Sequence, residues 1–417
     1  MSTRLGGLVI DVSPLRTSRP FRLLFTARLV TLMAIGLLVV AIPAQVYQLT
    51  GSSVHVAGVA TTLGMATFVG SMAGGVLVDR YERRRTIEVS RTVAGLGFLL
   101  LGINAVLPEP SVPLIYLGAA IDGLAGGVSG TALMAATAVL VPREKLAAAG
   151  ALVALTTDLG TIVSPAIAGL IIAAGGTAVT YFVAVAATAA TVTLVNRVGP
   201  VPAPGGTPEP PLRALATGLR FAGRHPVVRG VLLVGLLTML AGGPMVLLPA
   251  FVDQVLHAGP VTLGVLYAAP AVGAVLGSLG SGWTGRVRRS GIALLVAVAV
   301  MSLGIALLGT AAVAVVAFLG LAGHGLGRAL ADILRFAVLQ HNTPDELRGR
   351  ISALWQVQVV VGTAVGSVLA GLLGEWFAPD TALLVYGLAG VVLTALLVAV
   401  VQPVWRVRAT PAVSEGS

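Results

Sequence analysis

The stretch GGVLVDRYERRR (74–85) is a short charged segment between two long apolar segments. The apolar segments, residues 54–78 and 87–106, are each long enough to cross a membrane as a helix, which takes about 20 residues. Two adjacent glycines allow another backbone to approach closely, and Asp79 lies at the end of the first segment beside four arginines. Such a charged cluster can bind a neighbouring helix terminus and release it when helices move. The stretch therefore predicts a gating loop between two transmembrane helices.

The composition of the whole chain extends this interpretation. Of the 417 residues, 56% are hydrophobic and only 10% are charged, and the mean hydropathy is +0.97. A soluble domain carries about 25% charged residues, so an ordinary soluble enzyme is excluded. Apolar segments separated by charged or turn-rich breaks occur at residues 24–47, 54–78, 87–106, 113–140, 147–174, 177–196, 229–252, 260–283, 290–309, 312–339, 352–377 and 381–403. The sequence predicts an all-α integral membrane protein with twelve transmembrane helices.

The basic residues predict the orientation in the membrane. Outside the apolar segments, Lys and Arg occur only at the N-terminus, in alternate loops and in the C-terminal tail. Cytoplasmic loops are enriched in Lys and Arg, so both termini are expected in the cytoplasm, with membrane lipids beside the basic loops. Binding of nucleic acid is disfavoured, because the basic segments are short and lack interleaved aromatic residues.

The chain is predicted to contain two halves. A segment rich in Pro and Gly, and too polar to span a membrane, is expected to form a cytoplasmic linker (199–228). The linker joins six-helix halves at 1–198 and 229–403, and a cytoplasmic tail follows at 404–417. A shift of 202 residues aligns the halves, matching Pro142 with Pro344, Glu144 with Glu346, Gly160 with Gly362 and Gly169 with Gly371. The pattern predicts two parallel six-helix repeats around a central cavity, as in transporters that rock about a midplane site.

Several kinds of chemistry are not supported by the residues. The chain has no cysteine, and its five histidines show no metal-ligand spacing. It contains no G-x-x-x-x-G-K-[ST] loop to hold the phosphates of a nucleotide. We therefore expect no cofactor, no metal and no enzymatic activity, and a transport cycle driven by an ion gradient and not by a nucleotide.

Acidic residues inside apolar segments are candidates for proton coupling. A charged group at the bilayer centre costs about 2.5–3.5 kcal/mol on insertion scales, so each one suggests a function. Asp122, Asp158 and Asp332 are the candidates, and the alternatives for the first two are a hydrogen-bonded packing role or a pairing with a nearby Arg.

Further polar residues are candidates for a substrate cavity. His324, Arg328 and Arg335 share a helix with Asp332 and fall within an arc of about 80°, which predicts one polar stripe facing water. Arg335 could instead extend toward the cytoplasmic surface. The remaining candidates for the cavity, each with a structural alternative, are Arg28, Gln356 and Gln358. Glu88 and Arg91 are expected to form a structural ion pair.

Two motifs resemble signatures of the major facilitator superfamily. The loop at 74–85 resembles G-x-L-x-D-R-x-G-R-R, with Glu82 in place of the second glycine, and GWTGRVRR (282–289) is a degenerate counterpart. The segment GTIVSPAIAG (160–169) resembles the antiporter signature G-x-x-x-G-P-x-x-G-G, with Ser and Ala replacing two glycines. The resemblance implies a gating role for Gly75, Asp79, Arg80, Arg83, Arg84, Gly160 and Pro165.

A further resemblance covers nearly the whole chain. LPEPS (107–111), TALMAATAVLV (131–141) and TPDELRGRISALW (343–355) are similar to the enterobactin exporter group of this superfamily. The resemblance implies export of a catecholate siderophore across the inner (cytoplasmic) membrane of a bacterium. The alternatives are a multidrug efflux pump for hydrophobic compounds and an uptake permease. The first apolar segment lacks the Asp of many drug–proton antiporters, and Ala119 lies near where those proteins often carry Arg, so their coupling machinery does not transfer.

Overall fold

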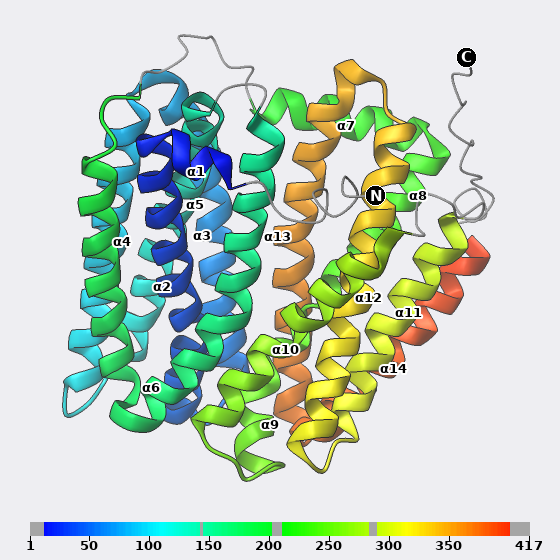
Figure 1. Ribbon diagram of the computed structural model, residues 1–417. Helices are drawn as coiled ribbons and strands as arrows, with labels where there is room; N and C mark the ends of the chain where they lie inside the picture. Colours follow the sequence, from blue (N-terminus) through cyan, green and yellow to red (C-terminus); the bar gives the residue numbers. More distant parts are fainter. Residues whose placement is uncertain (1–11, 142–144, 202–210, 283–289, 401–417) are drawn as a thin grey trace, which may run out of the picture. The chain divides into compact units, whose positions relative to one another are not determined.

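The computed structural model describes residues 12–141, 145–201, 211–282 and 290–400, and in these ranges the chain is helical, with no β-strand. The elements, shown in Figure 1, are α1 (Ser13–Thr17), α2 (Arg19–Thr50), α3 (Ser53–Arg80), α4 (Arg83–Val106), α5 (Val112–Leu140), α6 (Leu146–Asn196), α7 (Pro211–Arg224), α8 (Pro226–Leu240), the 3₁₀ helix η2 (Gly243–Leu247), α9 (Leu248–Gln254), α10 (Pro260–Leu279), α11 (Ser290–Gly309), α12 (Ala314–His341), α13 (Asp345–Trp376) and α14 (Pro379–Val400). Within the described ranges, 11 helical segments are long and apolar enough to cross a membrane. The prediction of an all-α, multi-pass membrane protein is confirmed, whereas the count of twelve helices and the 202-residue repeat stay predictions.

Some sequence predictions fall on residues outside the described ranges. These are the tail at 404–417, the central part of the linker (202–210), nearly all of the degenerate signature (283–289), and Pro142 and Glu144 of the repeat. The end of the predicted linker is helical, because α7 and the first turn of α8 lie within residues 211–228.

Two helical regions are interrupted at glycine. In α6 the backbone leaves helical geometry at Gly176, with φ of 78° and ψ of 179°, and residues with a Cβ rarely adopt this positive φ. The interruption falls between the predicted segments 147–174 and 177–196. The predicted segment 229–252 is not one continuous helix, because α8 ends at Leu240 and is followed by η2 and α9. At Gly243 an added Cβ would overlap the backbone of Gly366, so the chain passes too close to α13 for any larger residue.

The chain divides into two compact units, residues 1–49 with 62–208, and residues 50–61 with 209–417. In the first unit, α2 and α6 meet through small residues. A Cβ added at Gly36 would collide with the hydroxyl of Ser164, and one at Gly160 would lie 2.8 Å from Cβ of Leu32. Small residues let membrane helices approach closely enough for dispersion contacts to hold them together. Gly36 and Gly160 therefore allow α2 and α6 to pack closely.

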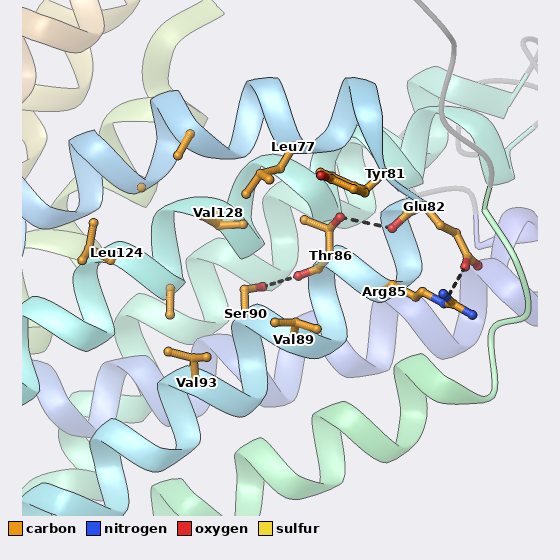
Figure 2. Close-up of a pocket in the computed structure, with 13 residues that line it drawn as sticks. Leu77, Tyr81, Glu82, Arg85, Thr86, Val89, Ser90, Val93, Leu124 and Val128 are labelled. Atoms are coloured by element: carbon orange, nitrogen blue, oxygen red, sulfur yellow. Dashed lines mark hydrogen bonds and ion pairs between the residues drawn. The ribbon is translucent and has the colours of Figure 1, made fainter.

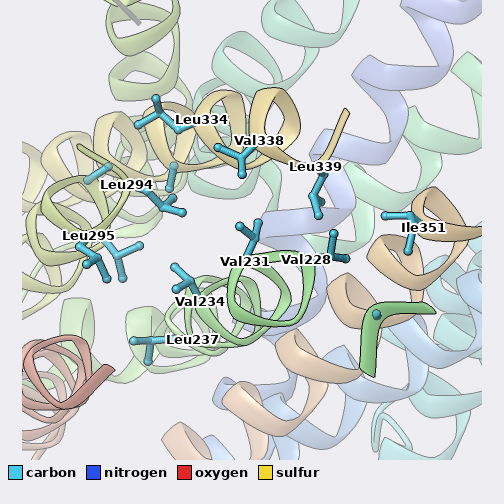
Figure 3. Packing of buried hydrophobic residues seen from close by; sticks show 14 residues of the cluster. Val228, Val231, Val234, Leu237, Leu294, Leu295, Leu334, Val338, Leu339 and Ile351 are labelled. Carbon is cyan, nitrogen blue, oxygen red and sulfur yellow. The ribbon is translucent and has the colours of Figure 1, made fainter. Parts of the chain in front are cut away.

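In the second unit, α8 is surrounded by apolar side chains from α11, α12 and α13 (Figure 3). Val228, Val231 and Val234 recur every three residues along α8 and are fully buried. The helix begins after His225, whose Nδ1 accepts a hydrogen bond of 3.4 Å from the backbone N–H of Val228. This packing fixes α8 against α12 and α13, the two helices that carry the charged cluster described below.

Candidate functional site

The arginines of the signature loop are held by two acids, one in the turn between α3 and α4 and one on α4. Tyr81 and Glu82 form the turn between α3 and α4. Arg84 Nε lies 3.5 Å from the Glu82 carboxylate and 3.7 Å from that of Glu88, and Arg85 Nε lies 3.3 Å from Glu82. Glu82, the residue that departs from the signature, is therefore the acid that binds these arginines. Among the described residues, Asp79 forms no ion pair within 4 Å in this conformation.

The same loop is attached to the C-terminal end of α6. The backbone N–H of Arg83 donates to the carbonyl of Val201 at 3.0 Å, and Arg84 Nη1 donates to the carbonyl of Asn196 at 3.3 Å. The Arg83 side chain is buried, whereas Arg80 is exposed. The arginines of the motif thus differ in their surroundings. Arg83 and Arg84 connect the start of α4 to the C-terminal end of α6.

A groove of about 510 Å³ lies beside this loop, between α3, α4 and α5 (Figure 2). Its walls are mainly apolar, with Glu82 and Arg85 at the loop. The hydroxyls of Thr86 and Ser90 donate to the backbone carbonyls of Glu82 and Thr86, at 3.1 and 2.7 Å. Gly74 accounts for the close packing of α3 on α5, since a Cβ there would lie 2.9 Å from Cα of Val128. At Gly75 an added Cβ would meet open space in the described part of the chain. The close approach expected at both glycines occurs only at Gly74.

A buried charged group lies deeper in the first unit. Arg91 on α4 is 2% exposed and donates through Nε to the hydroxyl of Ser129 at 2.6 Å. Asp122 on α5 is 6% exposed and lies in the electrostatic field of Arg91, and an added Cβ at Gly126 would be 3.9 Å from both groups. The expectation that Arg91 pairs with Glu88 is wrong: Glu88 lies beside Arg84 on the surface, and Arg91 faces α5.

Arg28 and Asp158 are placed by α2 and α6. Arg28 donates from Nε to the hydroxyl of Thr156 at 3.3 Å and from Nη2 to the hydroxyl of Thr157 at 3.4 Å. Asp158 is the next residue on α6, and its side chain is exposed. Asp122 and Asp158 were both candidates for proton coupling, but their environments differ: Asp122 is buried near Arg91, whereas Asp158 is exposed.

The predicted polar stripe on α12 is buried at both ends and exposed in the middle. His324 is 2% exposed and its Nδ1 lies 3.2 Å from the carbonyl of Met301 on α11, which gives this residue a packing environment. Arg328 has a side chain that is 46% exposed, and Asp332 one that is 34% exposed. Arg335 is fully buried and does not extend to the surface as the alternative interpretation expected. Only the middle of the stripe is therefore open to solvent.

Arg335 is enclosed by three helices. Its Nη1 lies 3.2 Å from Oδ1 of Asp332, its Nη2 donates to the Gln358 side-chain oxygen at 2.8 Å, and its Cζ lies 4.3 Å from the ring centroid of Trp355. Gln358 in turn donates to the carbonyl of Leu232 on α8. Gln358 is thus committed to a network between helices, whereas Gln356 is exposed. An Arg guanidinium that is stacked and hydrogen-bonded in this way is held rigidly.

Space for this guanidinium depends on Gly235 of α8. A Cβ at Gly235 would overlap Nη2 of Arg335 and would lie 2.5 Å from the Gln358 oxygen. The sequence alone gave no sign that Gly235, Trp355 and Ser129 belong to charged networks, because each is an ordinary residue of an apolar helix.

Buried ionisable groups on membrane-spanning helices are typical of proteins that move solutes or ions across a bilayer. The comparisons with known proteins assign the class. The sequence matches the Major Facilitator Superfamily over residues 24–331, and the chain belongs to this family of membrane transporters. It is a transport protein for a small molecule and not an enzyme.

The chain is similar over its whole length to proteins named Enterobactin exporter EntS. It is 39% identical to the protein of Shigella boydii serotype 18 and 38% identical to that of Escherichia coli O81, in each case over 97% of both chains. Solved structures agree on the fold. The nucleoside transporter NupG has a TM-score of 0.77 at 12% identity, covering 91% of this chain and 98% of that one. A bacterial homologue of the iron transporter ferroportin, in an inward-facing state, has a TM-score of 0.68 at 15% identity, covering 91% and 98%.

Proposed function

We propose that this protein exports an enterobactin-like catecholate siderophore across the bacterial cytoplasmic membrane, in exchange for protons. The observation that carries the proposal is the identity of 39% over 97% of both chains with a protein named enterobactin exporter. Because the aligned region covers nearly the whole chain, it includes the helices that carry the candidate site.

The proposed arrangement in the membrane follows the charge pattern. Two six-helix halves, residues 1–198 and 229–403, are joined by the linker 199–228, and both termini lie in the cytoplasm with the tail 404–417. The basic loops on one side support this orientation, since Lys and Arg are retained on the cytoplasmic face. Lipid head groups would be the neighbours of these loops.

Arg328 is the proposed contact for the substrate. An iron-free catecholate is aromatic and acidic, and the exposed guanidinium of Arg328 can stack on its ring and donate several hydrogen bonds to its oxygens. Arg28 and Gln356 are the proposed secondary contacts. His324 and Gln358, which the sequence placed in the same set, have partners on neighbouring helices and would contribute through packing.

The substitution Arg328→Lys tests this contact. Lysine keeps the positive charge but lacks the planar guanidinium, so we expect binding of enterobactin to weaken by about tenfold, or about 1.4 kcal/mol. Binding to the purified variant can be followed by fluorescence quenching. Arg85→Lys, at an exposed arginine of the loop, is the control and should bind as the wild type does. Equal affinity in the Arg328 variant would remove Arg328 from the substrate contacts.

The signature loop is the proposed gate. In the cycle we propose, Asp79 with Arg80, Arg83 and Arg84 stabilises one end state, and Gly75 allows the close approach of a helix in a conformation other than the one described. Gly160 and Pro165 would act at the packing of α2 on α6. The present partners of Arg84, the Glu82 and Glu88 carboxylates, support a loop whose arginines can exchange acidic partners.

Asp79→Asn tests the gate. We expect transport to fall by at least tenfold, because an amide cannot bind a guanidinium as a carboxylate does. The protein should remain in the membrane at the wild-type level, since no ion pair of Asp79 is found among the described residues of this conformation. Export unchanged at equal expression would eliminate the gating role of Asp79.

The function itself is tested in cells. A strain that lacks the gene, grown without iron, should retain the siderophore in its cytoplasm and release less to the medium, as measured by mass spectrometry of both fractions. Restoration by the intact gene is the control. An unchanged siderophore distribution together with new sensitivity to hydrophobic drugs would support multidrug efflux instead.

A further inference from the structure

The charged cluster on α12 holds one acid between two arginines of very different exposure. Asp332 Oδ1 lies 3.2 Å from Nη1 of Arg335, and Asp332 Oδ2 lies 3.9 Å from Nε of Arg328. Arg335 is fully buried, stacked on Trp355 and hydrogen-bonded to Gln358. Arg328 is 46% exposed, and its contact with Asp332 is its only ion pair among the described residues.

The distances indicate which of the two contacts is the weaker. At 3.9 Å, the Arg328–Asp332 pair is too long for a hydrogen bond, and both side chains are partly exposed. Pairs of this kind contribute little to stability. The Arg335–Asp332 contact is short and joined to a buried network. Asp332 can therefore release Arg328 while remaining bound to Arg335.

We propose that Asp332 is an internal counter-ion that occupies the anion site of Arg328 until an acidic substrate displaces it. This inference rests on the proposed function and deepens it. Two guanidiniums share one carboxylate, so the cluster has room for one further negative charge. A substrate with an anionic oxygen supplies that charge and releases Asp332 to Arg335 alone. A neutral molecule of the same shape cannot do so, and it must bind beside an intact ion pair.

In this arrangement, selectivity for anions depends on the Asp332 carboxylate as well as on Arg328. Asp332 weakens the binding of every anion at Arg328 by the same free energy that its own contact contributes. In exchange, an empty transporter does not present an unpaired arginine to chloride, phosphate or other small anions. Asp332 is thus a residue that sets specificity by acting on Arg328, and Arg335 positions it.

The test uses the purified full-length protein with two small probes, 2,3-dihydroxybenzoate, which is anionic, and catechol, which is neutral. The double variant Asp332→Asn/Arg335→Gln removes the competitor but leaves the net charge of the cluster at about +1, as in the wild type. We expect it to bind dihydroxybenzoate about fivefold more tightly, the value of a pair worth about 1 kcal/mol, and catechol unchanged.

A second variant gives a result of opposite sign and keeps the buried pair. Asp332→Glu retains a carboxylate for Arg335, and its extra methylene lets the carboxylate approach Arg328 more closely. We expect dihydroxybenzoate to bind several-fold more weakly and catechol to bind as before. This variant decides the question if the double variant does not fold, as judged by circular dichroism and size-exclusion chromatography.

The outcomes separate this inference from the proposed function. If enterobactin binds the wild type but the two probes respond alike to both variants, the counter-ion role is refuted and the siderophore proposal stands. Failure of dihydroxybenzoate to bind wild type also refutes the counter-ion role. If enterobactin itself does not bind, the proposed function fails first.

Discussion

Replacing Asp122 by asparagine is expected to abolish uphill export in proteoliposomes while downhill exchange of substrate continues. A carboxylate that carries a proton must gain and lose it within one cycle. Burial disfavours the ionised form of a carboxyl group, and a nearby cation favours it. When the two effects oppose each other, both the protonated and the ionised form are accessible. Asp122 meets both conditions, because it is 6% exposed and lies in the field of the buried Arg91.

The expected loss is large. One proton moving down one pH unit releases about 1.4 kcal/mol, and 100 mV adds about 2.3 kcal/mol. About 3.7 kcal/mol sustains a gradient of several hundredfold for a substrate that moves without net charge, and a transporter without its proton carrier sustains none.

Asp158→Asn is the matched comparison. Asp158 lies on α6 of the same unit, but its side chain is exposed, and we expect this variant to keep a proton-driven gradient. A gradient lost only in the Asp158 variant would transfer the role to that residue. If both variants still concentrate substrate, neither is the carrier, and Asp332 becomes the next candidate.

Replacing Arg335 by alanine is expected to lower the free energy of unfolding by about 2–4 kcal/mol. Removal of one partner of a buried pair leaves the other groups without their hydrogen bonds, and here the Gln358 oxygen loses its donor. The substitution also leaves a cavity among α8, α12 and α13. In detergent the melting temperature should fall by roughly 2–5 °C, which a thermal shift assay measures.

Arg85→Ala provides the control for this prediction, because its side chain is 76% exposed and forms one ion pair with Glu82. Exposed pairs contribute about 0–1 kcal/mol, so its melting temperature should barely change. Arg335→Lys should fall between the two, since lysine keeps the charge but lacks the planar guanidinium that stacks on Trp355 while separate nitrogens reach Asp332 and Gln358. Equal melting temperatures for Arg335→Ala and wild type would show that the network does not stabilise the fold.

The membrane fold could be predicted because its signal is repeated along the chain. Long apolar segments, basic loops and the signature near Asp79 each depend on local sequence, and local sequence is enough to place a helix in a bilayer. The break at Gly243 was not predicted, because it results from the close approach of Gly366 on a distant helix. Contacts of this kind depend on tertiary packing.

The candidate site could be predicted only in part. Ionisable residues in apolar segments are visible one by one, so Arg328, Asp332 and Asp122 were identified. Their partners were missed, because helical periodicity gives the face of a side chain but not the helix opposite it. Arg91 was expected to pair three residues away with Glu88, but it bonds to Ser129 on the next helix. Glu82 was recognised as a departure from the signature, and its role became visible only with Arg84 and Arg85 beside it.

The central claim is that this protein exports an enterobactin-like siderophore in exchange for protons. Its most direct test is the accumulation of enterobactin in proteoliposomes with an acidic lumen, with protein-free liposomes as the control. The account predicts that enterobactin accumulates above its external concentration as protons leave, and that a protonophore abolishes the accumulation. Entry that never exceeds the external concentration, or accumulation that persists with the protonophore, would contradict it.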